Sequence, residues 1–202
     1  STMEDLLEVQ SAYVEQTGLA GYMSTQAGAQ IAESIDKVSA AYSVGAGTTV
    51  GAVQTLMQLG SSMEDAVKLT AGMYKAAEKS GFDPEMIGKD LVDNAELVST
   101  YYGGMKDKAI AATIATKSMG VSLKQVGGIV DKMLNIDGFM TDMYELNAMG
   151  GPDLSQAFEL GLSGDLTGMM KEVMNATGGL EKFNQEAPLV KKKLAATLGM
   201  SV

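Results

Sequence analysis

The chain has 202 residues, which is enough for one domain with a hydrophobic core, or for one and a half. It contains no cysteine or histidine, and all 15 of its basic residues are lysines. Thiolate chemistry, the commonest general base and guanidinium recognition of phosphate are therefore missing.

The charge is strongly acidic and unevenly distributed. Residues 1–101 hold 14 acidic residues and 5 lysines (−9), whereas residues 102–202 hold 11 acidic residues and 10 lysines (−1). A net charge of −10 disfavours nucleic acid, so no specific nucleic-acid binding is expected. No apolar run approaches the roughly 18 residues that a membrane span requires. The 16 methionines indicate an irregularly packed interior.

The first 79 residues are predicted to form four helices from apolar positions at helical spacing, with expected bounds 2–16, 22–43, 49–59 and 62–79. The segment 18–21, bounded by glycines, should separate the first two. The glycine-rich stretch 44–51 superficially resembles a phosphate-binding loop, but no strand precedes it and no lysine precedes its threonines. A turn is therefore expected, with Thr48 or Thr49 capping the third helix.

Beyond residue 80, helices continue to the end of the chain. Asp83 and Pro84 form a cap and first turn of a helix that is expected to bend near Gly88, run to Tyr101 and stop at Gly103 and Gly104. Further helices are expected at 105–119, 122–135, 138–148, 153–161, 165–176, 179–184 and 187–198. No segment alternates like a strand. The predicted fold class is all-α, with many short glycine-terminated helices packed as an irregular helical bundle.

One local pattern recurs: an apolar residue, a glycine and, one or two positions later, a serine. It occurs at 59–62, 119–122 and 198–201. The glycine can close a helix in the left-handed conformation, and the serine can cap the next. Gln125 follows Ser122, and Glu64 follows Ser61, at the capping-box spacing. Residues 60–202 are thus expected to form a compact multi-helix lobe, with the small-residue-rich acidic helices of 1–59 beside it or between copies.

The carboxylates are the side chains of this chain that could most readily act as catalytic residues. Glycoside hydrolysis needs two of them across a cleft, and the candidate pairs are Glu64 with Asp65, Asp83 with Glu85, Asp142 with Glu145, and Asp153 with Glu159. Most lie at predicted helix starts, where capping and the helix dipole account for them. No catalytic residue is therefore predicted, and the chain is not expected to be an enzyme.

Three other segments suggest sites but have simpler explanations. Residues 135–138 hint at a calcium loop, yet Met133 and Leu134 occupy upstream ligand positions, so a turn capped by Asp137 is expected. The stripe of Met169, Met170, Val173 and Met174 is either core or a partner groove, with core favoured. Lysines 191–193 could contact phosphate, but a solvated helix face is favoured. No cofactor-binding or metal-ligating residue is predicted.

The order of motifs in the second part of the chain provides a family resemblance. The motifs are Gly120-Val121-Ser122-Leu123, Val130-Asp131-Lys132-Met133-Leu134, Leu162-Ser163-Gly164-Asp165-Leu166-Thr167-Gly168, Gly178-Gly179-Leu180-Glu181-Lys182-Phe183-Asn184 and Val190-Lys191-Lys192-Lys193-Leu194-Ala195. In this order they resemble part of the tail tape-measure proteins of tailed bacteriophages, over roughly residues 60 to 202. Gly161-Leu162-Ser163 departs from the more helical Ala-Leu of that family, and residues 1–59 show no likeness.

The resemblance implies a structural role in the virion. Tape-measure proteins are long, mostly helical chains that occupy the lumen of the tail tube, set tail length during assembly and leave ahead of the DNA. Their partners are other copies and the tail-tube and baseplate hub proteins. Ser201 resembles a helix cap, so the chain is expected to be a segment of a longer protein. The alternatives are a helical virion or adaptor binding module and, less favoured, a cell-wall hydrolase-associated domain.

Overall fold

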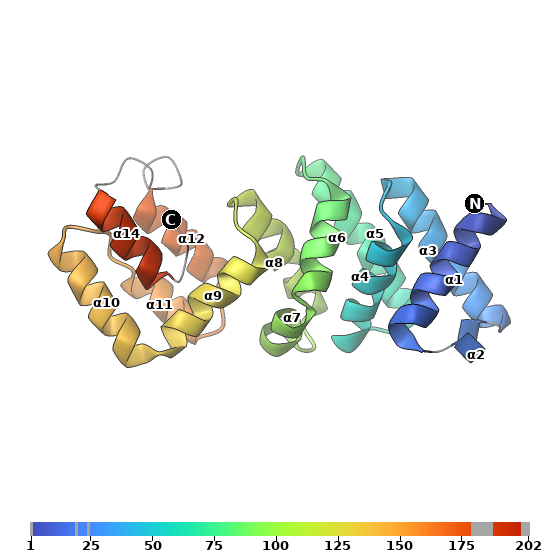
Figure 1. The fold of residues 1–202 in the computed structure, drawn as a ribbon, viewed down its shortest axis with the longest axis horizontal. Helices are drawn as coiled ribbons and strands as arrows, with labels where there is room; N and C mark the ends of the chain where they lie inside the picture. Colours follow the sequence, from blue (N-terminus) through green and yellow to red (C-terminus); the bar gives the residue numbers. More distant parts are fainter. Residues whose placement is uncertain (1, 19, 24, 179–187, 199–202) are drawn as a thin grey trace. The chain divides into compact units, whose positions relative to one another are not determined.

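The computed structural model describes residues 2–18, 20–23, 25–178 and 188–198. These residues form α-helices and no strand, which confirms the predicted all-α fold class (Figure 1). The helices are α1 (Met3–Thr17), α2 (Ala20–Met23), α3 (Gln26–Tyr42), α4 (Ala46–Gln58), α5 (Met63–Lys79), α6 (Pro84–Asp93), α7 (Ala95–Tyr102), α8 (Lys106–Ser118), α9 (Leu123–Leu134), α10 (Ile136–Ala148), α11 (Ser155–Leu162), α12 (Leu166–Thr177) and α14 (Pro188–Thr197).

The chain divides into two compact units, residues 1–114 and residues 115–202. The predicted division at residues 59 and 60 instead falls inside the first unit. The physical reason is that α4 packs against α1, α3, α5 and α6, so helices on both sides of the predicted boundary share one core. The division that the structure shows lies within α8, where no glycine or proline marks it in the sequence.

The first unit is organised around α4. Val50, Ala52, Val53 and Leu56 are all fully buried, and so is Thr49 on the same helix. A helix that is buried around most of its circumference belongs in the centre of a bundle. Tyr42 of α3 and Tyr74 of α5 pack edge to face beside it, with ring centroids 5.8 Å apart.

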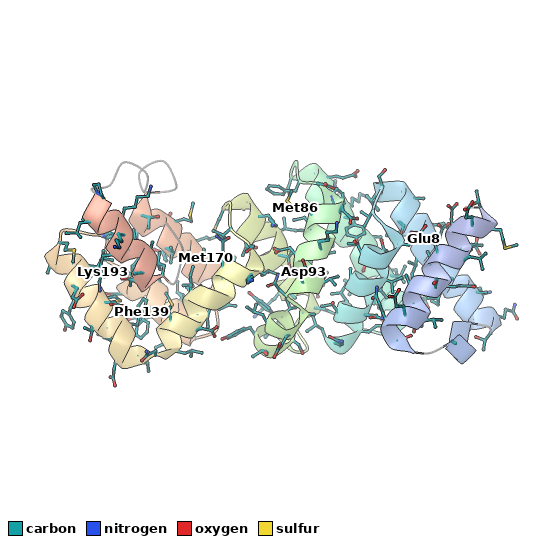
Figure 2. The ribbon with its side chains drawn as sticks, in the orientation of Figure 1. Glu8, Met86, Asp93, Phe139, Met170 and Lys193 are labelled. Atoms are coloured by element: carbon teal, nitrogen blue, oxygen red, sulfur yellow. The ribbon has the colours of Figure 1, made fainter. Side chains whose placement is uncertain are left out.

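The second unit has a core rich in methionine and aromatic side chains. Met133 of α9 is buried, and so are Met169, Met170 and Val173 of α12, whereas Met174 is half-buried. The favoured interpretation of the methionine stripe as core is therefore confirmed for three of its four residues. Phe139 of α10 and Phe158 of α11 stack with centroids 5.0 Å apart. Figure 2 labels Phe139 and Met170 on these helices.

Several helix ends follow the predicted local chemistry. Gly120 has a φ of 75° directly after α8, and Ser122 with Gln125 forms a complete capping box at the start of α9. Asp83 caps α6, and Pro84 lies in its first turn. No helix continues through Gly103 and Gly104, so the expected break there is also confirmed.

Other helix boundaries differ from the prediction. The helix expected at 22–43 begins at Gln26 behind the cap Thr25, and α2 is separate from it. The capping serine before α5 is Ser62, which accepts from the Asp65 amide, so the expected pairing of Ser61 with Glu64 is wrong. The helix expected at 179–184 and the pattern at 199–201 lie outside the described residues.

The break after α6 also lies elsewhere than predicted. The helix that was expected to bend near Gly88 instead ends at Asp93 and restarts at Ala95. The Asn94 side chain donates to the Asp90 carbonyl oxygen at 2.7 Å and competes for the hydrogen bonds of the last turn. Gly88 lies buried inside α6, where it serves close packing.

Candidate functional site

The amino end of α4 contains a connected group of polar side chains. The predicted caps Thr48 and Thr49 are wrong, because the N-cap position is Gly45 and it has no side chain to offer. Glu85 of α6 supplies the missing acceptor. Its Oε2 accepts from the Gly45 amide at 2.8 Å, and its Oε1 accepts from the Thr48 hydroxyl at 2.8 Å. A carboxylate from another helix thus caps α4 at the end where the helix dipole favours negative charge.

The pKa of Glu85 is set by opposing effects. Partial burial of the carboxyl would raise its pKa, but the hydrogen bonds from the Gly45 amide, the Thr48 hydroxyl and Lys89 outweigh it. The pKa of Glu85 therefore lies below its ordinary value. Lys89 Nζ lies 3.1 Å from Glu85 Oε1, one turn along α6. Because every effect except burial favours the anion, this carboxylate is a structural anion and a poor proton donor.

Two buried hydroxyl groups are hydrogen-bonded in a chain that runs from this cap into the core. Ser39 of α3 donates to Thr49 Oγ1 at 2.9 Å, and Thr49 donates to the Gly45 carbonyl oxygen at 3.2 Å. Tyr74 lies alongside, and burial raises the pKa of its phenol well above the ordinary range. A phenol with so high a pKa stays neutral. The group therefore contains no residue poised to accept or donate a proton near neutral pH.

In the second unit, a similar polar group joins α10 to α14. Lys193 Nζ lies 2.7 Å from Asp142 Oδ1 and 2.6 Å from Glu145 Oε2, and its side chain is only 17% exposed. Figure 2 labels Lys193 on α14. Hydrogen bonds to Asp142 and Glu145 raise the pKa of Lys193. The prediction that lysines 191–193 form a solvated helix face is therefore wrong for Lys193. The candidate pair of Asp142 and Glu145 is brought together around this lysine.

Several of the other candidate carboxylates contact residues that are close to them in the sequence. Glu64 pairs with Lys68 at 2.8 Å, one turn along α5, and Asp83 accepts from the Glu85 amide at 3.0 Å. Asp153 accepts from the amide of Ser155 at 2.9 Å, and its hydrogen bonds lower its pKa. Asp137 is not the cap that was expected, because α10 begins at Ile136, two residues earlier than predicted, with Asn135 at the N-cap position. Within the described residues, no three acidic side chains are grouped so that they could hold a metal ion.

A shallow cavity of about 230 Å³ lies between α1 and α4, and no sequence motif pointed to it. Its walls are Tyr13, Gln16, Thr17, Gln54, Met57 and Gln58. The Nε2 atom of Gln54 is buried there without a hydrogen-bond partner. The lining contains no carboxylate and no lysine. It therefore lacks the titratable pair that hydrolysis needs.

Two helices also expose apolar side chains at regular spacing. On α10, Ile136 is 50% exposed and Tyr144 is 73% exposed, with the half-buried Met140 between them at the same four-residue step. The opposite side of α10 holds the buried Phe139, Met143 and Leu146. On α1, Met3 and Leu7 are exposed one turn apart. Such stripes are typical of surfaces that contact other proteins.

Comparisons with protein-family models, with curated proteins and with solved structures find no match for this chain. The likeness to tape-measure proteins therefore depends on the motifs alone, and the function that it implies remains a proposal. None of the helices in the described part of the chain is both long and apolar enough to cross a membrane.

Proposed function

We propose that the chain is a non-enzymatic structural segment of a phage tail tape-measure protein, present in the virion in the tail lumen or hub. The ordered motifs from Gly120 to Ala195 support the proposal. Apart from Gly179–Asn184, which lies outside the described residues, these motifs fall on helices and helix ends of the second compact unit. Together with the rest of a longer chain, the segment would contribute to setting tail length during assembly.

The observation that carries the structural role is the use of the carboxylates. Glu85 caps α4 from α6, and Asp142 and Glu145 hold Lys193 of α14. Side chains bound in this way fix helices to one another. This favours a structural segment over a cell-wall hydrolase-associated domain.

The proposed partners are other copies of the chain and the tail-tube and baseplate hub proteins. The apolar stripe on α10 supports contact with protein, because Ile136 and Tyr144 present large apolar surfaces to solvent. The same stripe favours the second candidate function, a helical adaptor module of a virion. The two candidates differ in where the chain is found and in how many copies.

The deciding experiment is quantitative mass spectrometry of purified tails from the virus that encodes the chain. A tape-measure segment should be present in several copies per tail and covalently continuous with a longer protein. The same peptides should be lost from particles after DNA ejection. An adaptor would instead be found in a fixed ring stoichiometry and be retained after ejection. Absence of the chain from purified particles would refute both.

The hydrolase alternative has its own test, a dye-release assay on purified peptidoglycan. The full chain is expected to release no more dye than buffer, and Glu85→Gln and Asp142→Asn are matched variants. Release by the natural chain that either variant abolishes would establish an enzyme and overturn the proposal.

A further inference from the structure

The shallow cavity between α1 and α4 contains a hydrogen-bond donor that the protein itself does not satisfy. Gln54 of α4 is half-buried, and its Nε2 atom is buried without a hydrogen-bond partner. A buried amide nitrogen without an acceptor lowers the stability of the fold, so it calls for an acceptor from outside the chain. Gln54 lines the cavity, and the last torsion of a glutamine side chain is soft enough to turn its amide toward an occupant.

The rest of the lining restricts the chemistry of an occupant. Polar but uncharged side chains come from Gln16 and Gln58, and apolar surface comes from Tyr13 and Met57. The Gln16 amide is already held, because its Nε2 donates to the Gly47 carbonyl oxygen at 3.1 Å. No lysine or carboxylate lines the cavity. An ionised ligand would therefore lose its hydration without an opposite charge to replace it, whereas a neutral polar group would not.

We propose that this cavity binds a primary carboxamide, the side-chain group of a glutamine or asparagine on a peptide of another protein. The carbonyl oxygen of a carboxamide accepts from Gln54 Nε2, and the group as a whole is neutral. Its methylene groups pack on Tyr13 and Met57. The volume of about 230 Å³ lies below the roughly 300–1,000 Å³ of pockets that enclose drug-sized ligands, so it suits one side chain. The inference is independent of the tape-measure proposal.

The test is a titration of the full chain, followed by nuclear magnetic resonance, with glutamine, glutamate and methionine, each capped by an acetyl group and a methylamide. The three probes share one backbone and differ only at the end of the side chain. Capped glutamine is expected to shift the side-chain amide resonances of Gln54 and the backbone amides of α4. The charged glutamate and the apolar methionine should bind at least about tenfold more weakly, because neither offers a neutral carboxamide.

Two variants separate binding in the cavity from the stability of the fold. Gln54→Leu keeps a side chain of similar length and removes the unpaired amide. It should therefore unfold at a higher temperature than the natural chain while binding capped glutamine at least about tenfold more weakly. Gln30→Leu, at an exposed glutamine of α3, is the matched control and should leave the affinity unchanged. Propionamide carries the same group without a peptide backbone and should bind more weakly than capped glutamine.

Four results would overturn the proposal. If capped glutamine shifts no resonance, water alone occupies the cavity. If capped methionine binds as well as capped glutamine, the carboxamide is not recognised. Full affinity in Gln54→Leu, or a lower unfolding temperature of that variant, would show that the unpaired amide is not the binding group. Propionamide binding as tightly as capped glutamine would assign the cavity to small free amides and refute a peptide partner.

Discussion

Gly88→Ala is predicted to destabilise the first unit, although alanine is the better helix former. Gly88 lies inside α6, and a Cβ added there would be 2.7 Å from Thr48 Cγ2 and 2.8 Å from the Tyr74 hydroxyl oxygen. Neither the Thr48 side chain nor the Tyr74 side chain can move away from the added methyl group. The Thr48 hydroxyl donates to Glu85, and Tyr74 is fully buried against Tyr42.

The magnitude follows from two opposing contributions. Replacing glycine with alanine inside a helix gains about 1 kcal/mol. Overpacking a core that cannot relax costs about 1–3 kcal/mol, and two fixed neighbours place this site in the upper part of that range. The net loss in the free energy of unfolding is therefore expected to be about 1–2 kcal/mol.

Gly72→Ala is the matched control. Gly72 also lies inside a helix of the first unit, but nothing lies within 4 Å of its added Cβ, so this variant should gain about 0.5–1 kcal/mol. Urea denaturation followed by circular dichroism measures both, and hydrogen exchange in α4 and α6 assigns the change to the first unit. The double variant Gly88→Ala with Thr48→Ser removes the clashing methyl, keeps the hydroxyl and should recover part of the loss. Gly88→Ala as stable as Gly72→Ala would refute the packing argument.

Three further predictions concern helix ends and the contacts between helices. Glu85→Gln should lower the free energy of unfolding by about 1–2 kcal/mol at pH 7. Because the folded pKa of Glu85 is depressed, its contribution is present above the ordinary value of 4.5 and is lost as pH falls through the folded pKa. The two urea curves should therefore converge in acid, and a difference that persists at low pH would contradict the assignment. Lys193→Ala should cost about 1 kcal/mol and the exposed Lys192→Ala nearly nothing, by thermal denaturation. The raised pKa of Lys193 means that its contribution is present below 10.5 and is lost as pH rises through the folded pKa. Gly120→Val should cost about 1–2 kcal/mol because φ there is 75°, and Gly120→Asn should cost less; equal costs would argue against strain.

Short-range signals in the sequence predicted much of the fold. The capping box of Ser122 and Gln125, the cap and proline at Asp83 and Pro84, and the positive φ of Gly120 each depend on residues within a few positions of one another. Such contacts form within one turn of chain. A sequence pattern can therefore identify them without knowledge of the tertiary structure.

The features of the structure that were not predicted depend on contacts between residues far apart in the sequence. Glu85 caps Gly45 across 40 residues, and Lys193 reaches Asp142 across 51. Nothing local distinguishes these side chains from other surface charges. Gly88 illustrates the same limit, because a glycine inside a helix is equally compatible with a bend and with close packing. Only the positions of Thr48 and Tyr74 decide between the two.

The lengths of the helices lead to a prediction about the proposed role in tail length. A continuous helix rises 1.5 Å per residue, so 202 residues in one helix would span about 300 Å. In the described residues the longest helices, α3 and α5, have 17 residues each, which corresponds to about 25 Å. A segment folded in this way contributes far less length per residue than an extended helix. Deleting residues 1–202 in frame from the proposed longer protein should therefore shorten tails, measured by electron microscopy, by much less than about 300 Å. Shortening by the full 300 Å would mean that the segment unfolds into a continuous helix in the assembled tail, against the glycine breaks at Gly104, Gly120 and Gly150.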